Sequence, residues 1–139
     1  MKPRDPFHPN AFELDLFASK IQAGFSAFAD DTLEGKLDLN AHLVKNPPAT
    51  FFVRATGDSM MGAGIHPEDI LVVDRSLSPT HGKIVIAAID GELTVKRLYK
   101  KDGVVRLDPE NPAYNPILIS SEADLMIWGV VTYVIHSTS

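Results

Sequence analysis

The sequence predicts a mainly β domain built from short strands and hairpins. Two Asp-Gly pairs, Asp90-Gly91 and Asp102-Gly103, each lie between strand-like segments, and Asp-Gly favours a two-residue hairpin turn because both positions tolerate positive φ. From position 50 onward, segments rich in β-branched and aromatic residues recur between turn residues. With 139 residues, 45% of them hydrophobic, the chain is long enough for one domain with a substantial core.

Residues 1–40 are expected to form an extended N-terminal arm ahead of the β-rich domain at residues 41–139. Early prolines and scattered phenylalanines give this arm no sustained periodicity. Apolar residues alternate over residues 12–16 as in a strand, whereas Phe17 and Ile21 have helical spacing. The pattern therefore leaves the local structure of the arm open.

After the arm, the chain is expected to form a short helix and then strands. The helix runs from Asp38 to Lys45, with Asp38 or Asn40 as its N-cap, and Pro47 and Pro48 end it because they lack N–H groups. The predicted strands follow in chain order at residues 50–55, 70–73, 84–89, 92–98, 104–107, 117–119 and 126–135. Many short strands separated by turns favour an all-β domain.

The composition excludes several classes of protein. A formal net charge of −5 argues against direct binding of duplex DNA, since phosphate contacts need clustered Lys and Arg. The chain has no cysteine and its histidines never lie three to five residues apart, so no metal site and no cofactor are expected. No apolar segment approaches the roughly 18 to 20 residues that cross a bilayer, and no signal-peptide pattern is present. A soluble, cytoplasmic protein is expected.

Ser59 and Lys96 are the candidate catalytic residues. Ser59 follows Gly57 in a bend after a hydrophobic strand, and Lys96 lies within an alternating strand, so the two side chains can meet in one β domain. A serine hydroxyl becomes a good nucleophile when a neighbouring base takes its proton, and a lysine is such a base only when neutral. A fall of the lysine pKa from about 10.4 to about 7 requires roughly 4.6 kcal/mol of disfavoured charge, which burial must supply.

The strand pattern leaves the burial of Lys96 open. Alternation places Thr94 and Lys96 on the same face of their strand, and both faces of that strand carry an apolar and a charged residue. A neutral Lys96 also requires the carboxylates of Asp58 and Glu92 to point away from it. The alternative is that Ser59 is a turn residue and Lys96 a solvated strand lysine.

Four segments carry a more specific signal, at residues 57–60, 69–74, 81–88 and 91–98. Together they resemble the UmuD family of SOS mutagenesis proteins, which belongs with the LexA-type Ser-Lys self-cleaving proteins. The resemblance extends from residue 23 to residue 131 and so covers most of the chain. It implies a LexA/UmuD-type peptidase domain, mainly β, with short twisted strands, hairpins and an extended N-terminal arm.

By this resemblance, Ser59 is the nucleophile and Lys96 the general base, Ala23-Gly24 is the scissile bond, and the backbone N–H groups of Asp58 and Ser59 are the oxyanion donors. The family implies a serine endopeptidase that acts on itself in the SOS response to DNA damage. The RecA filament on single-stranded DNA is implied to stimulate the cleavage. The processed homodimer is implied to be the accessory subunit of a UmuC-type Y-family translesion DNA polymerase. Whether cleavage occurs within a protomer or across the dimer stays open.

One alternative is a non-catalytic dimeric adaptor that binds a polymerase. Aromatic residues on the predicted strands supply its contacts, at Phe51, Phe52, Trp128 and Tyr133. Aromatic residues on strands also commonly belong to the core, so the pattern does not decide between the two roles.

A second alternative is a Ser-His-Asp hydrolase. Candidate bases and acids follow Ser59 in the chain, at His66, Asp69, Asp74 and His81. The Gly-x-Ser-x-Gly elbow of many such hydrolases is absent, because Met61 stands two residues after Ser59. Replacement of Lys96 or of His81 by alanine distinguishes the Ser-Lys dyad from this triad.

Overall fold

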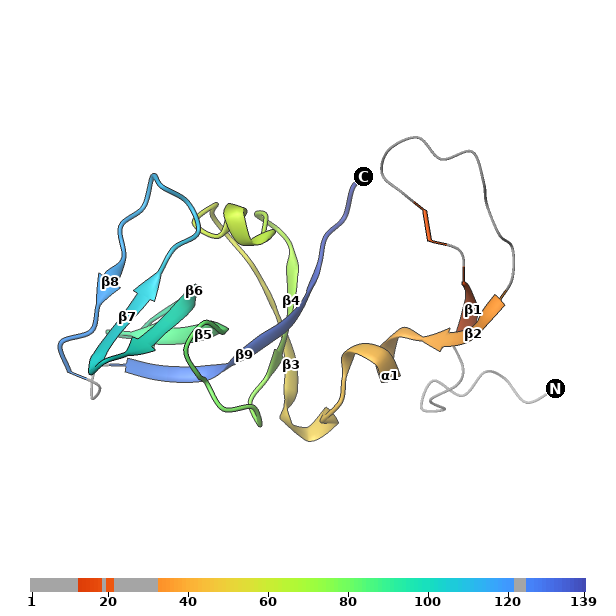
Figure 1. Ribbon diagram of the computed structural model, residues 1–139, viewed down its shortest axis with the longest axis horizontal. Helices are drawn as coiled ribbons and strands as arrows, with labels where there is room; N and C mark the ends of the chain where they lie inside the picture. The colour runs from red at the N-terminus through yellow and green to blue at the C-terminus, as the bar shows by residue number, and fades with distance from the viewer. Residues whose placement is uncertain (1–12, 19, 22–32, 122–124) are drawn as a thin grey trace. The chain divides into compact units, whose positions relative to one another are not determined.

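A computed structural model describes residues 13–18, 20–21, 33–121 and 125–139 of the chain (Figure 1). The chain divides into two compact units, Met1–Lys45 and Asn46–Ser139. The described part of each unit contains an antiparallel β-sheet, so the predicted mainly β class is confirmed.

The first unit contains a two-stranded sheet of β1 (Glu13–Phe17) and β2 (Leu33–Asp38). The alternating pattern, not the helical spacing, therefore describes the start of the arm. β2 has no counterpart among the predicted strands, because Gly35 and its charged residues give it little β propensity. Its pairing with β1 supplies what the local sequence lacks, and Lys36 forms an ion pair with Asp15 directly opposite.

The helix predicted at residues 38–45 is present as the shorter α1 (Leu39–Leu43), which ends at a Val44 C-cap before the prolines are reached. The carboxylate of Asp38 accepts a hydrogen bond from the Ala41 N–H at 3.3 Å, so Asp38 is the N-cap, one of the two predicted candidates. The predicted cleavage site, Ala23-Gly24, falls outside the described residues.

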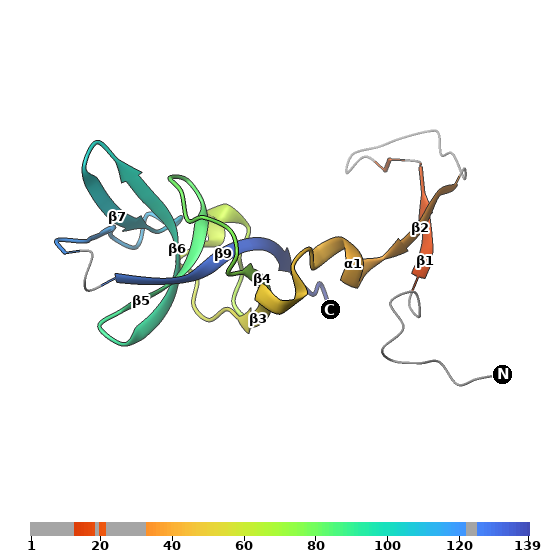
Figure 2. The same cartoon turned by 90° about the horizontal axis from the view of Figure 1, so that it is seen from below.

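The second unit is a seven-stranded antiparallel sheet in the order β3-β4-β9-β5-β6-β7-β8 (Figures 1 and 2). Its strands are β3 (Thr50–Arg54), β4 (Ile70–Asp74), β5 (Ile84–Ile89), β6 (Glu92–Lys101), β7 (Val104–Asp108), β8 (Ile117–Leu118) and β9 (Leu125–Ile135). The 3-10 helix η1 (Pro47–Ala49) precedes β3, and η2 (Met61–Ala63) follows it. Each predicted strand is present with ends within one residue of those expected, except that β6 continues beyond Leu98 to Lys101.

Both predicted hairpins are confirmed. Asp90 and Gly91 join β5 to β6 with φ of 51° and 82°, and Asp102 and Gly103 join β6 to β7 with φ of 54° and 77°. A two-residue turn with positive φ at both positions matches the twist of the strands it connects. The resulting register sets Lys96 directly opposite Val85.

β9 joins the two halves of the sheet. Its first half pairs with β5 and its second half with β4, so it runs between them (Figure 2). At the crossing, a Cβ on Gly129 would lie 2.6 Å from Val73 Cγ1, closer than real atoms approach. Glycine is therefore required where β9 passes from one neighbour to the other.

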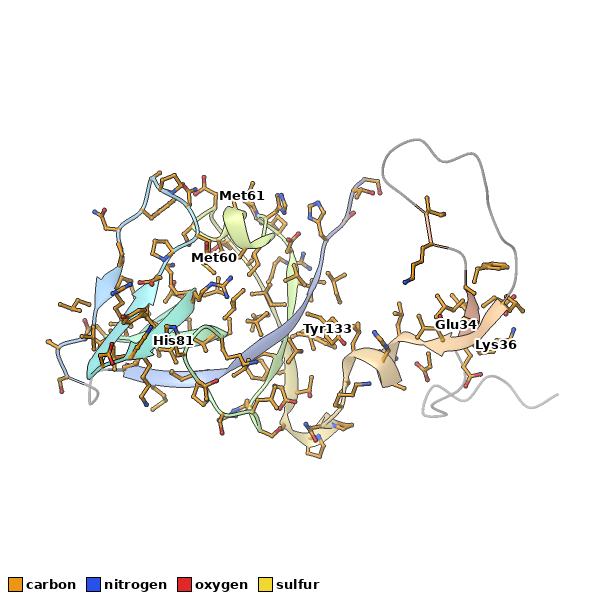
Figure 3. The ribbon with its side chains drawn as sticks, in the orientation of Figure 1. Glu34, Lys36, Met60, Met61, His81 and Tyr133 are labelled. Carbon is orange, nitrogen blue, oxygen red and sulfur yellow. The ribbon has the colours of Figure 1, made fainter. Side chains whose placement is uncertain are left out.

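Two clusters of buried side chains lie on opposite sides of β5. One contains Ala55, Met60, Ile65, Leu71, Val73 and Ile86, and the other contains Val85, Ala87, Leu98, Leu107 and Val130. Successive residues of β5 thus alternate between the two clusters, as strand geometry requires. Beside η2 (Figure 3), Met60 is 1% exposed in the first cluster, whereas its neighbour Met61 is 40% exposed. Met60 therefore anchors the segment that carries Ser59.

Candidate active site

The segment between β3 and η2 places Ser59 just after a bend. Gly57 has φ of +75°, in the left-handed region that favours glycine. Before the bend, the Ala55 N–H donates to the Asp69 carbonyl at 2.8 Å, and after it the Met60 side chain is buried in the core. The bend is therefore held on both sides, and Ser59 stays half-buried rather than enclosed.

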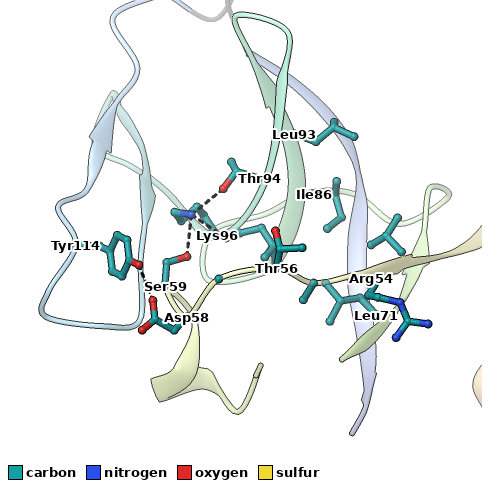
Figure 4. Close-up of a pocket in the computed structure, with 14 residues that line it drawn as sticks. Arg54, Thr56, Asp58, Ser59, Leu71, Ile86, Leu93, Thr94, Lys96 and Tyr114 are labelled. Carbon is teal, nitrogen blue, oxygen red and sulfur yellow. Dashed lines mark hydrogen bonds between the residues drawn. The ribbon is translucent and has the colours of Figure 1, made fainter. Parts of the chain in front are cut away.

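Lys96 of β6 reaches this bend (Figure 4). Its Nζ donates hydrogen bonds to Ser59 Oγ at 3.0 Å, to Thr94 Oγ1 at 2.7 Å and to the Val95 carbonyl at 3.2 Å. Lys96 is only 8% exposed, although lysine is among the residues least often buried. The structure thus brings the two predicted catalytic side chains into contact and answers the question that strand alternation left open.

Burial lowers the pKa of Lys96 below its ordinary value. In the part of the chain that the structure describes, no carboxylate hydrogen-bonds to its Nζ and counteracts this effect. The Asp58 carboxylate instead accepts a hydrogen bond from the Tyr114 hydroxyl, which raises the pKa of Tyr114, and Glu92 is exposed. The surroundings of Lys96 therefore shift its protonation equilibrium towards the neutral amine.

The polar neighbours of Nζ suit a general base. A neutral lysine amine has two N–H groups and one lone pair. The Val95 carbonyl can only accept a hydrogen bond and Thr94 Oγ1 is able to accept one, so these two oxygens can hold both N–H groups. The lone pair is then left for the Ser59 hydroxyl, which is the contact that proton removal needs.

The loop between β7 and β8 holds the carbonyl groups of Asp58 and Ser59. Asn111 Nδ2 donates to the Asp58 carbonyl at 2.9 Å, and the Glu110 N–H donates to the Ser59 carbonyl at 2.8 Å. The described peptide bonds are trans, so the Ser59 N–H points away from the anchored Asp58 carbonyl. Neither the Asp58 N–H nor the Ser59 N–H has an acceptor among the described residues, so both are available to an incoming oxygen.

A pocket of about 340 Å³ opens at Ser59 and Lys96. Residues 53–59 form one side, residues 93–96 form another, and Leu71 and Ile86 contribute apolar surface. Among the described strands, β3 pairs with β4 alone, so its other edge has free backbone groups. An extended peptide can bind such an edge through its own backbone and place a small side chain in the pocket.

Comparison with known proteins identifies the family. Residues 15–132 match the family described as Peptidase S24-like. The chain belongs to this family. The matched segment of this S24-like chain contains Ser59 and Lys96 as well as Ala23 and Gly24.

Individual relatives agree with this assignment. The S24-like chain is 46% identical to Protein ImpA of Salmonella typhimurium over 143 aligned positions, which cover 99% of this chain and 93% of that protein. It is 52% identical to Protein SamA of Salmonella typhimurium strain LT2 over 123 positions, covering 88% and 85%. It is 34% identical to the LexA repressor of Clostridium perfringens over 128 positions, covering 84% of this chain and 63% of that protein. The predicted resemblance to UmuD-type and LexA-type proteins is confirmed.

Three side chains at the S24-like site had no predicted role. Thr94 shares the face of Lys96 in the predicted strand, and that placement was the available signal for its contact with Nζ. Asn111 and Tyr114, which both hold Asp58, lie between the strands predicted at residues 104–107 and 117–119. A contact across more than 50 positions of sequence leaves no local pattern.

The histidines that a Ser-His-Asp site would need make their hydrogen bonds away from Ser59. Of the two candidate bases, neither His66 nor His81 hydrogen-bonds to Ser59. His81 Nδ1 accepts the Lys100 N–H at 3.1 Å, and His136 contacts Asp69. This arrangement favours the lysine over a histidine as the base for Ser59.

Across the described residues, no helix combines the length and apolar content needed to cross a membrane.

Proposed function

We propose that this S24-like protein is a serine endopeptidase that cleaves itself between Ala23 and Gly24, with Ser59 as nucleophile and Lys96 as general base. The observation that carries the proposal is the 3.0 Å contact between Ser59 Oγ and the Nζ of Lys96, a buried residue whose pKa is lowered by desolvation. The S24 family includes self-cleaving serine peptidases, which agrees with this assignment.

The proposed reaction has two stages. Ser59 Oγ attacks the Ala23 carbonyl carbon while its proton moves to Lys96 Nζ. The C–N bond to Gly24 then breaks, Lys96 returns the proton to the leaving amine, and Ser59 holds residues 1–23 as an ester. A water molecule, activated by the same amine, hydrolyses that ester and restores Ser59. Every proton transfer therefore passes through one nitrogen.

The backbone N–H groups of Asp58 and Ser59 are the proposed oxyanion donors. Both lack an acceptor among the described residues, and the neighbouring carbonyls are held by Asn111 and Glu110. Donors that are fixed before the reaction need no reorganisation when negative charge develops on the Ala23 oxygen, and such a donor is worth about 3 to 4 kcal/mol in the transition state.

The substrate segment is proposed to bind the open edge of β3 beside the pocket. Ala23 has only a methyl side chain and Gly24 has none, so this peptide can come close to Ser59, and the segment belongs to the same chain or to the partner protomer. Tethering raises the effective concentration of the substrate, so little intrinsic affinity is needed. A RecA filament on single-stranded DNA that binds the docked state preferentially would increase its population and the cleavage rate without supplying a catalytic group.

The cleaved product is proposed to act as a homodimer that serves a UmuC-type Y-family polymerase in translesion synthesis, in the cytoplasm. Aromatic side chains on the surface support a role in binding proteins, since Phe52 is 56% exposed, Trp128 40% and Tyr133 38%. The same exposed side chains support the second candidate function, a polymerase adaptor that does not cleave.

The two candidates are distinguished by incubating the purified chain with RecA, a nucleotide and single-stranded DNA, and measuring masses before and after. Self-cleavage predicts a fragment that begins at Gly24, and Ser59→Ala abolishes it. Ser78→Ala, which changes an exposed serine away from the site, serves as the matched control and leaves cleavage unchanged. A cut at another bond refutes the proposed cleavage site. A chain that stays intact and still binds the polymerase supports the adaptor function instead.

A further inference from the structure

A cluster of three side chains lies where the end of β9 meets the start of β4. The two strands are antiparallel with Ile135 opposite Ile70, so the next residues outward, His136 and Asp69, are neighbours. His66 joins them through a turn in which its N–H donates to Asp69 Oδ2 at 2.8 Å. The register and the turn therefore gather residues that lie far apart in sequence.

The cluster presents two imidazole nitrogens to one carboxylate. His136 Nδ1 lies 2.6 Å from Asp69 Oδ1, and His66 Nδ1 lies 3.7 Å from Asp69 Oδ2. The ligand atoms of all three residues lie within 4.8 Å of one another. Asp69 is 3% exposed, so the carboxylate is held by the fold, whereas the two imidazole side chains are 41% and 44% exposed and can adjust.

One atom of the cluster has no hydrogen-bond partner among the described residues. His66 Nδ1 is buried and makes no hydrogen bond with the described residues. The His66 and His136 rings lie 4.5 Å apart between centroids with an interplanar angle of 32°, so the two imidazoles are close neighbours. The ion pair between His136 and Asp69 gives a partner to His136 Nδ1 and to Asp69 Oδ1, but it gives His66 Nδ1 no hydrogen bond. A buried polar atom normally has a hydrogen-bond partner.

We propose that His66, Asp69 and His136 bind a divalent transition-metal ion, for which Zn²⁺ is the best match. Two imidazoles and a carboxylate suit zinc and its neighbours, whereas Ca²⁺ and Mg²⁺ prefer oxygen ligands throughout. Zinc bonds of about 2.0 to 2.1 Å set ligands roughly 3.3 Å apart in a tetrahedron, so small rotations of the exposed imidazoles complete the site. A water molecule would fill the fourth position. The bound ion would tie the end of β9 to the turn before β4.

The test is titration of the untagged, full-length protein with Zn²⁺ by calorimetry, and with Co²⁺ by visible absorption, which reports tetrahedral coordination. We expect one saturable site. His66→Gln and His136→Gln should each weaken binding by about tenfold or more, because each removes a metal ligand. Both side chains are partly exposed, so the variants should still fold. His81→Gln is the matched control, since that histidine lies in the turn before β5 and outside the cluster, and it should bind zinc like the unchanged protein.

Absence of saturable binding, or binding that His66→Gln leaves unchanged, overturns the proposal. Binding that is lost in His81→Gln instead would also overturn it, since the ion would then sit elsewhere. A crystal grown with zinc and measured at its absorption edge gives an independent readout: an anomalous peak bonded to both imidazoles and Asp69 supports the site. The measurement does not involve cleavage, so it stands apart from the proposed peptidase activity.

Discussion

Lys36 on β2 and Lys96 on β6 both lie in antiparallel sheets, yet their surroundings shift their pKa values in opposite directions. Lys36 is exposed, and its hydrogen bond and charge interaction with Asp15, which lies opposite on β1, raise its pKa. Lys96 faces Val85 across the strand pair and is buried, and desolvation lowers its pKa. The cross-strand partner and the depth of burial, not the residue type, therefore decide in which direction the pKa of each lysine moves.

The acids near Lys96 have other partners. Glu110 pairs with Arg97, the neighbour of Lys96 on β6, and Asp58 accepts from Tyr114. Because successive strand residues point to opposite faces, Arg97 takes its carboxylate on one face while Lys96 meets only hydroxyl and carbonyl oxygens on the other. Arg97 and Glu110 therefore lie near the site, but neither charged group contacts the amine of Lys96.

The largest expected effect comes from Lys96→Arg. Arginine keeps the positive charge but cannot lose its proton in a protein, so proton removal from Ser59 stops. We expect the proposed self-cleavage to slow by about 10² to 10⁴-fold, the usual contribution of a general base. Lys36→Arg is the matched control and should cleave at the normal rate. Fragment formation followed by mass spectrometry measures both, and equal rates in the two variants would remove Lys96 from the mechanism.

A smaller effect is expected when Lys96 is given the kind of partner that Lys36 has. Thr94→Asp places a carboxylate where Oγ1 now lies 2.7 Å from Nζ, and an opposite charge raises the pKa of a lysine. Cleavage in the unchanged protein should rise with pH until the neutral amine predominates and then level off. In Thr94→Asp the same rise should begin at higher pH, with cleavage about tenfold slower or more at neutral pH.

Thr94→Asn is the control for this pH profile, because it has nearly the same shape as Asp and no charge. Its profile should keep the midpoint of the unchanged protein, even if the loss of the hydroxyl lowers the rate at every pH. A common shift in both variants would mean that shape, not charge, sets the behaviour of Lys96. Rates measured from pH 6 to 11 without RecA would separate the two outcomes.

The contrast between the two lysines also shows what the sequence can predict. The hairpins at Asp90-Gly91 and Asp102-Gly103 follow from local turn chemistry, and the strands around them follow from alternation. β2 does not, because its stability depends on pairing with β1 rather than on its own residues. Local sequence patterns therefore predict hairpins and strands that local residues stabilise, but not a strand such as β2 that depends on its pairing partner.

At the candidate site, too, some features can be predicted from the sequence and others arise only from the fold. Family resemblance points to Ser59 and Lys96, but the burial that lowers the pKa of Lys96 arises from how several strands and the Ser59 segment pack around it. The contact between Tyr114 and Asp58 and the His66-Asp69-His136 cluster join residues far apart in the chain. No spacing rule along the sequence can find them, since the fold creates the proximity.

The smallest expected effect comes from Asp15→Asn, which removes the partner of Lys36. The pKa of Lys36 should fall towards its ordinary value, because the hydrogen bond and the charge that raise it are lost. The melting temperature should stay unchanged within error, since exposed ion pairs contribute little to stability. The cleavage rate should also stay unchanged, because Lys36 has no proposed role in proton transfer. A clear slowing in Asp15→Asn would mean that the β1-β2 pairing helps to present the segment between these strands, which contains Ala23-Gly24, and that the two lysines are not independent.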